Sequence, residues 1–140
     1  MTQVPAHFFR QSAVLPYRFQ GEELQILLVT SRTKRRWVLP KGVQEPELSP
    51  DLSAAKEALE EAGVEGEVES MAIGSYRYGK WGGTCTVLVF PMLVETVHED
   101  WLESERERQW LAAEEAVSRV DEAELKQLIR EFAALQLRKG

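Results

Sequence analysis

The segment 49–63 carries the start and end signals of a single helix, and strand-like segments lie on both sides of it. Ser49 suits the N-cap position, Pro50 the first helical position, and Gly63 the position just past a helix end. These signals predict a helix over residues 50–62. A chain with a helix fixed between groups of strands is restricted to layered α/β folds, because each sheet face needs an apolar cover.

Apolar runs predict the strands on either side of this helix. The longest, 84–96, contains Pro91, and a proline inside a strand predicts an edge position or a bulge because it has no N–H to donate. Cys85 is the only cysteine, so no disulfide can form within the chain, and it is interpreted as a strand residue rather than a nucleophile. The other predicted strands are residues 12–19, 24–30, 36–39, 66–78 with a break near Gly74, and 109–112.

Two more helices are predicted near the C-terminus, over residues 113–119 and 121–135. In the second helix, apolar residues recur at helical spacing, and Asp121 and Glu124 resemble a capping box at its start. The apolar stripe consists of Leu125, Leu128, Ile129, Phe132 and Leu135. Together with the strands, these helices predict an α/β fold in which a mixed sheet lies between helices.

The central helix places three carboxylates, Glu57, Glu60 and Glu61, on one face, because residues three and four apart are neighbours on a helix. Like charges this close repel by about 0.2–0.5 kcal/mol per pair. A divalent cation would turn this repulsion into affinity, since hard cations prefer carboxylate oxygens. The alternative is an ordinary solvated face. The opposite face, which is predicted to pack on the core, carries Leu52, Ala55, Leu59 and Ala62.

A basic cluster directly precedes this acidic helix, in a chain whose net charge is −6. The negative total argues against general nucleic-acid binding. A polyphosphate substrate needs cations for its outer oxygens and a carboxylate-bound metal at the phosphorus that is attacked. Arg32, Arg36 and Lys41 are therefore candidate phosphate contacts, with an ordinary charged turn as the alternative. For Lys34 and Arg35 the charged turn is the favoured interpretation.

Residues 42–64 resemble the signature motif of the Nudix hydrolases, in which a glycine, a glutamate, an Arg-Glu pair, a Glu-Glu pair and a final glycine stand at fixed spacings. Two positions depart from this motif, because Leu48 stands where the first glutamate is expected and Lys56 where the arginine is expected. Ala58 is a small substitute for an aliphatic residue of the motif. The matching positions are Gly42, Glu57, Glu60, Glu61, Gly63 and Val64.

The resemblance implies an α/β/α sandwich with a mixed sheet, the terminal helix on one face and the acidic helix on the other, and a single Nudix domain over residues 1–140. It also implies a metal-dependent hydrolase in which water attacks phosphorus, and it leaves open which glutamate is the general base. The expected cofactor is Mg²⁺, with Mn²⁺ as an alternative. The implied catalytic residues are Glu57, Glu60 and Glu61, which with the carbonyl of Gly42 would also hold the metal. The implied phosphate contacts are Arg18, Arg32, Arg36 and Lys41.

The two departures allow two hypotheses, because in the family the first glutamate and the arginine support the geometry of the loop and the helix. In the first hypothesis, metal binding is kept and the loop is braced differently, with Glu45 or Glu47 in place of the missing carboxylate. In the second, the chain is a non-catalytic Nudix-fold module that binds a phosphorylated ligand. Retention of all three metal carboxylates favours the enzyme.

The stretch 30–42 resembles the branch of the family that hydrolyses diphosphoinositol polyphosphates and diadenosine polyphosphates, and so does 106–116. This resemblance implies cleavage of a phosphoanhydride (pyrophosphate) bond in a nucleoside or inositol polyphosphate. The branch commonly has a run of glycines where this chain has Lys41-Gly42-Val43, so the identity of the substrate is not carried over. Candidates to stack on a base, with ordinary packing as the alternative, are Tyr76, Tyr78, Trp81 and Trp101.

Length and composition agree with one small domain that takes a small-molecule substrate. The chain has 140 residues, of which 44% are hydrophobic, enough to bury a core. No apolar run reaches the about 18 residues of a membrane helix, and the N-terminal segment 1–5 lacks the pattern of a secretory signal. These features, with the single cysteine, predict a cytoplasmic location.

Overall fold

The computed structural model describes residues 4–139, in which the predicted strands and helices occur in the predicted order, together with a 3-10 helix at Ala6–Phe9 and a strand at Lys41–Val43 that were not predicted. Among these residues, no helix combines the length and apolar character needed to cross a membrane. The prediction about a secretory signal falls partly on residues 1–3, which lie outside the described residues.

The helices are η1 (Ala6–Phe9, a 3-10 helix), α1 (Pro50–Ala62), α2 (Ala113–Arg119) and α3 (Ala123–Lys139). The strands are β1 (Arg10–Gln20), β2 (Glu23–Thr30), β3 (Trp37–Val38), β4 (Lys41–Val43), β5 (Val64–Val68), β6 (Gly74–Lys80), β7 (Gly83–Val97) and β8 (Arg108–Ala112).

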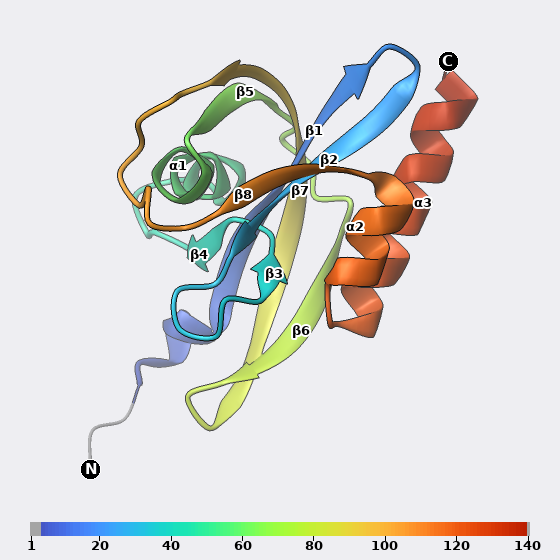
Figure 1. Ribbon diagram of the computed structural model, residues 1–140. Coiled ribbons are helices and arrows are strands. Elements are labelled where there is room, and N and C mark those ends of the chain that lie inside the picture. The colour runs from blue at the N-terminus through green and yellow to red at the C-terminus, as the bar shows by residue number, and fades with distance from the viewer. Residues whose placement is uncertain (1–3, 140) are drawn as a thin grey trace.

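The eight strands form one mixed sheet, in which β1 and β7 are parallel and the other pairs are antiparallel. The strand order is β3-β2-β1-β7-β5, with β4 also paired to β1, β6 to β7 and β8 to β2. Figure 1 shows α1 on one side of the sheet and α2 and α3 on the other. The predicted α/β fold, a mixed sheet between helix layers, is confirmed.

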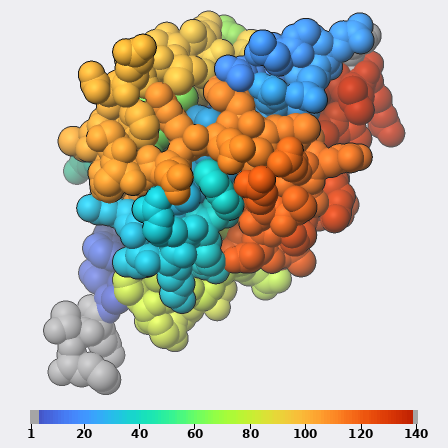
Figure 2. All heavy atoms as spheres, in the orientation of Figure 1, coloured from blue at the N-terminus to red at the C-terminus, as the bar shows by residue number. Residues whose placement is uncertain are grey.

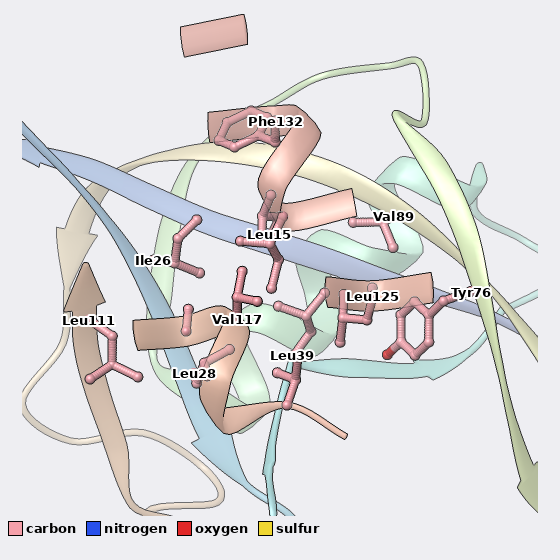
Figure 3. Packing of buried hydrophobic residues seen from close by; sticks show 14 of the residues in the cluster. Leu15, Ile26, Leu28, Leu39, Tyr76, Val89, Leu111, Val117, Leu125 and Phe132 are labelled. Carbon is pink, nitrogen blue, oxygen red and sulfur yellow. The ribbon is translucent and has the colours of Figure 1, made fainter. Parts of the chain in front are cut away.

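The α3 side of the sheet holds the larger apolar side chains. Leu125, Ile129 and Phe132 of α3 are buried, as the predicted stripe requires, whereas Leu135 at its end is 50% exposed. Figure 3 shows Leu125 and Phe132 gathered around Leu15 of β1. Because burying one large apolar side chain stabilises a fold by about 1.5–3 kcal/mol, this layer is a main source of stability.

The α1 side packs through small residues instead. Ala54, Ala58 and Ala62 are fully buried and contact apolar side chains of the sheet. Alanine brings the helix axis close to the strands, because only a methyl group separates the two backbones. The close approach has a second effect: Glu61, one position before Ala62, is carried into the interior with it and is 8% exposed.

The predicted buried face of this helix is wrong at two of its four positions. Leu52 and Leu59 are 52% and 39% exposed, whereas Ala62 is buried and Ala55 is partly buried against the core. The sequence pattern predicts a buried face that includes both leucines, but the buried row of the helix consists of Ala54, Ala58 and Ala62. The apolar leucines therefore face solvent, and part of the carboxylate face lies inside.

The predicted ends of α1 are confirmed at Pro50 and Ala62. Ser49 occupies the N-cap position, but its side chain makes no capping hydrogen bond. Gly63 follows the helix with a φ of 66°, a left-handed conformation that glycine adopts without steric cost. The helix that carries the predicted metal ligands is thus fixed at its C-terminal end.

Pro91 lies neither in an edge strand nor at a bulge, so this prediction is wrong. β7 pairs with β1 on one side and with β6 and then β5 on the other. Pro91 falls where the partner changes, between Val89, the last residue paired with β6, and Met92, the first paired with β5. Pro91 is paired with Leu15 in the parallel ladder of β1, but no residue of β5 or β6 is paired with it, so a missing N–H is tolerated on that side. The register shift of β5 lies at Glu65 and Gly66.

The capping box predicted for the last helix is also wrong. α3 begins at Ala123, and the carboxylate of Glu124 accepts hydrogen bonds from the backbone N–H and the guanidinium of Arg77 on β6. Arg77 offers Glu124 several hydrogen-bond donors, so the carboxylate binds Arg77 instead of the backbone at the start of its own helix. α2 spans the predicted residues, whereas α3 begins two residues later than predicted and continues past 135 to Lys139. Cys85 is a buried residue of strand β7, as predicted.

Candidate active site

An open cavity of about 840 Å³ lies where α1 meets β4, the β2–β3 loop and the hairpin between β6 and β7. Gly42, Glu57 and Glu61 are among its lining residues. The β2–β3 loop, residues 31–36, forms another part of the wall. Figure 2 shows the segment that contains this loop (cyan) lying against the segment around residues 98–112 (orange).

Glu57 and Glu61, one helical turn apart, bring two carboxylates to this cavity. Glu57 lies directly on Gly42, because a Cβ added to Gly42 would come within 2.4 Å of the carboxyl carbon of Glu57. Glu61 Oε1 accepts a hydrogen bond from the backbone N–H of Lys41 at 3.1 Å. Three of the four predicted metal-binding residues, Gly42, Glu57 and Glu61, therefore meet in one place.

Both carboxyl groups are weakened as acids by their surroundings. The pKa of Glu57 is raised to about 8, first by burial and then by the negative charges of Glu61 and Glu60. Burial also raises the pKa of Glu61, against the opposing effects of the Arg106 guanidinium and the Lys41 N–H. A cation bound between two such carboxylates removes the repulsion that raises these pKa values.

Glu60, the fourth predicted metal-binding residue, is directed elsewhere. One of its carboxylate oxygens lies 3.5 Å from Nζ of Lys56, and Glu60 is not among the residues that line the cavity. Within residues 4–139, no three or more His, Cys, Asp and Glu side chains are grouped as a metal site requires. The donor set still fits Mg²⁺, which takes oxygen ligands and usually keeps several waters, because the carboxylates of Glu57 and Glu61 line the cavity beside Gly42.

The structure brings three of the four predicted phosphate contacts to the cavity. Arg32, Arg36 and Lys41 line it, and Arg18 does not. Arg18 lies over the ring of Trp110 instead, with its guanidinium carbon 4.2 Å from the ring centre. Lys41 is deeply placed, and burial lowers the pKa of its ammonium group. The predicted phosphate contacts that reach the cavity thus come from β4 and the β2–β3 loop.

Ion pairs with distant acids fix the β2–β3 loop. Arg32 pairs with Glu105 at 3.5 Å, and Arg36 pairs with Asp121 at 3.2 Å. Arg35 is the exposed turn residue that the sequence predicts, whereas Lys34, interpreted in the same way, also lines the cavity. Because these arginines are about half exposed, their pairs can exchange for phosphate oxygens at small cost.

Arg106 is the main residue of the site that sequence reasoning missed as a functional residue. Its side chain is 9% exposed, lines the cavity and lies 3.6 Å from Oε2 of Glu61. The guanidinium also donates to Oε1 of Glu103 at 2.8 and 3.0 Å and to the Thr30 carbonyl at 2.9 Å. Arg106 stands in a charged loop without periodicity, so only the resemblance of the stretch 106–116 to the polyphosphate hydrolases could have singled it out.

The loop that carries Arg106 is anchored to the C-terminal end of α1. Trp101 Nε1 donates to the Glu61 carbonyl at 3.0 Å, and Arg108 donates to the Ala62 carbonyl at 2.7 Å. Arg108 also stacks on Trp101, 3.8 Å from the ring centre. Trp101 therefore serves packing, as the alternative interpretation held.

Three of the aromatic candidates do line the cavity. Tyr76 is buried, and the hydroxyl of Tyr78 donates to Oε1 of Gln11 at 2.8 Å. Trp81 is 41% exposed at the turn between β6 and β7, where its φ of 55° is unusual for a bulky residue. The cavity thus combines carboxylates, cations and aromatic rings.

Comparison with known proteins agrees with this geometry. The model of the NUDIX domain family matches residues 8–133. The mouse (Mus musculus) diphosphoinositol polyphosphate phosphohydrolase 3-alpha is 34% identical over 119 residues, which cover 83% of this chain and 71% of that protein. Nudix hydrolase 21 of Arabidopsis thaliana, a chloroplastic protein, is 33% identical over 125 residues, or 84% of this chain and 63% of that protein.

A solved structure supports the same fold. The crystal structure of a C. elegans Ap4A hydrolase superimposes with a TM-score of 0.75 at 23% identity, covering 91% of this chain and 97% of that one. The family match spans most of the chain and includes every part of the cavity described above. The chain therefore belongs to the Nudix family, as the motif in residues 42–64 predicts.

Proposed function

We propose that this protein is a metal-dependent hydrolase that cleaves a phosphoanhydride (pyrophosphate) bond in a nucleoside or inositol polyphosphate. The observation that carries the proposal is the pairing of Glu57 and Glu61 against Gly42 in a cavity that Arg32, Arg36 and Lys41 also line. The names of the relatives support two substrate classes, the diphosphoinositol polyphosphates and the diadenosine polyphosphates.

Glu57 and Glu61, with the Gly42 carbonyl, would hold Mg²⁺ or Mn²⁺, and Glu60 would join after its side chain leaves Lys56. A bound divalent ion at this place lowers the pKa of a water ligand and neutralises charge that develops on phosphoryl oxygens. One of these glutamates accepts the proton of the attacking water.

The remaining residues of the cavity bind and orient. Arg32, Arg36 and Lys41 would contact the phosphates that are not attacked, since guanidinium and ammonium groups donate charge-assisted hydrogen bonds to phosphate oxygens. The Arg106 guanidinium lies 3.6 Å from Oε2 of Glu61 and favours the ionised form of that carboxyl, which lowers its pKa against the effect of burial. In this proposal, the arginines and Lys41 bind the substrate phosphates, and the glutamates bind the metal ion.

We also predict a cytoplasmic protein that forms one Nudix domain over residues 1–140 and binds small polyphosphates rather than nucleic acids in general. The net charge of −6 supports the last point, because a nucleic-acid surface is normally basic.

The test is release of phosphate or nucleotide from diadenosine polyphosphates, diphosphoinositols, nucleoside triphosphates and nucleoside diphosphate sugars, with Mg²⁺ and with a chelator. We expect cleavage of one class that the chelator abolishes. Glu61→Gln should lower kcat by about 100-fold or more, because the bound metal contributes several kcal/mol, whereas Glu47→Gln on the exposed loop should not. Ligand-induced stabilisation without turnover of any class would favour the non-catalytic binding module instead.

A further inference from the structure

The contact between Gly42 and Glu57 makes the site sensitive to the position of one loop. Gly42 is the middle residue of β4, all of which pairs with β1, and residues 44–49 then lead from β4 to α1. Because Gly42 leaves no room for a methyl group beside the Glu57 carboxylate, β4 and α1 already touch. The 44–49 loop joins these two touching elements, so a shift of the loop on α1 would change how closely β4 approaches the Glu57 carboxylate.

The chain lacks the side chains that the Nudix motif places at two supporting positions, where it has Leu48 and Lys56. The structure shows another link at the same place. Lys56 Nζ lies 2.9 Å from Oε2 of Glu45, and the backbone N–H of Glu45 donates to Oγ of Ser53 at 3.1 Å. Glu45 is thus tied twice to α1, by its carboxylate and by its backbone, while Glu47 is exposed.

We propose that Glu45 and Lys56 are positioning residues, whose ion pair replaces the Glu–Arg support of the motif and holds the 44–49 loop on α1. The same ammonium group lies 3.5 Å from Glu60, so it connects the loop to the row of carboxylates on the helix. The inference rests on the proposed function, because the position of the loop matters only if Gly42, Glu57 and Glu61 bind a metal ion.

Removing Lys56 has two opposing effects on Mg²⁺ affinity, so whether the affinity rises or falls shows which effect is larger. Loss of a positive charge near Glu57 and Glu60 makes the site more negative, and this alone would strengthen Mg²⁺ binding. Loss of the link between loop and helix would weaken it. The pair is about half exposed, so the link should contribute about a 1.5- to 5-fold change in affinity.

The experiment is calorimetric titration of Mg²⁺ into the full-length wild type, Lys56→Met, Glu45→Ala and the double variant, with Glu47→Ala as the matched loop control. We expect Lys56→Met to bind Mg²⁺ about 1.5- to 5-fold more weakly. Glu45→Ala should lose a similar factor, and the double variant should lose no more than either single variant, because residues of one pair are not additive. Glu47→Ala should bind like the wild type.

A kinetic comparison separates positioning from general stability. In Lys56→Met, kcat should fall while KM for the substrate changes little, because Arg32, Arg36 and Lys41 are untouched. Lys56→Arg should restore both the affinity and kcat, since it keeps the charge. The melting temperatures of the metal-free variants should lie within a few degrees of the wild type.

Equal or tighter Mg²⁺ binding by Lys56→Met would overturn the positioning role. So would opposite effects of Lys56→Met and Glu45→Ala that cancel in the double variant, because this is the pattern of independent charges. Failure of the wild type itself to bind Mg²⁺ would instead contradict the proposed function, so the two failures are distinguishable.

Discussion

The two long helices that cover the sheet bury opposite kinds of side chain. α3 buries Leu125, Ile129 and Phe132, whereas α1 buries alanines together with Glu61 and leaves Leu59 exposed. In a helix selected only for stability, the leucines would face the sheet. The difference shows that α3 supplies packing, while α1 gives up packing so that its carboxylates lie at the cavity.

The largest test of this division is Phe132→Ala in α3. Removing a buried phenylalanine should lower the free energy of unfolding by about 3–5 kcal/mol, measured by urea denaturation. The Mg²⁺ affinity of the folded protein should stay the same, because Phe132 is not among the residues that line the cavity. Leu135→Ala, on the same helix but half exposed, is the control and should cost less than about 1 kcal/mol. Weakened Mg²⁺ binding in folded Phe132→Ala would break the division.

A smaller effect is expected from pH, and it acts through α1. A carboxyl group whose pKa rises from 4.5 to about 8 on folding binds its proton more tightly in the folded state. Its contribution to the stability of the metal-free protein is therefore full below about pH 4.5 and is lost as the pH rises through 8. The melting temperature with a chelator should fall over this range, and Glu57→Gln should flatten the fall.

Mg²⁺ should reverse that trend, because the ion competes with the proton for Glu57. The rise in melting temperature that Mg²⁺ causes should be larger at pH 8.5 than at pH 6.5. The prediction is contradicted if, with a chelator present, wild type and Glu57→Gln show the same change of melting temperature between pH 4.5 and pH 8.5.

The smallest effect is expected at Leu59, on the outer side of α1. Leu59→Ser should change the free energy of unfolding by about 0.5 kcal/mol or less, because the side chain is already 39% exposed. Ala58→Leu, at the neighbouring buried position, is the contrasting variant and should cost about 1–3 kcal/mol through overpacking. A large loss in Leu59→Ser would mean that the leucine, not the alanine row, anchors the helix.

The sequence predicted the elements well because their signals are local. Pro50 and Gly63 mark the ends of α1, and the apolar runs mark the strands, so neither depends on what lies across the fold. The spacing of the motif is also a local signal. It predicts Gly42, Glu57 and Glu61 as metal-binding residues, and the structure places these three together at the cavity.

Most of the failures concern partners that are distant in the chain, although Glu60 is drawn away by Lys56, one helical turn earlier. The inward face of α1 depends on how closely the sheet can approach, and Pro91 is tolerated because two strands change places beside it. Glu124 leaves its local capping position for Arg77, and Arg106 reaches Glu61 only after its loop folds over α1. Spacing within a segment carries no information about any of these contacts.

The parallel pairing of β1 with β7 sets an order of events during synthesis. It joins Arg10 to Thr86, so one edge of β1 has no partner until β7 has left the ribosome. Contacts this far apart in the chain form slowly, and an open strand edge can pair with other chains in the meantime. α1 is synthesised before β7, although it packs on both β1 and β7. We therefore expect the packing of α1 to be completed only after β7 has been synthesised.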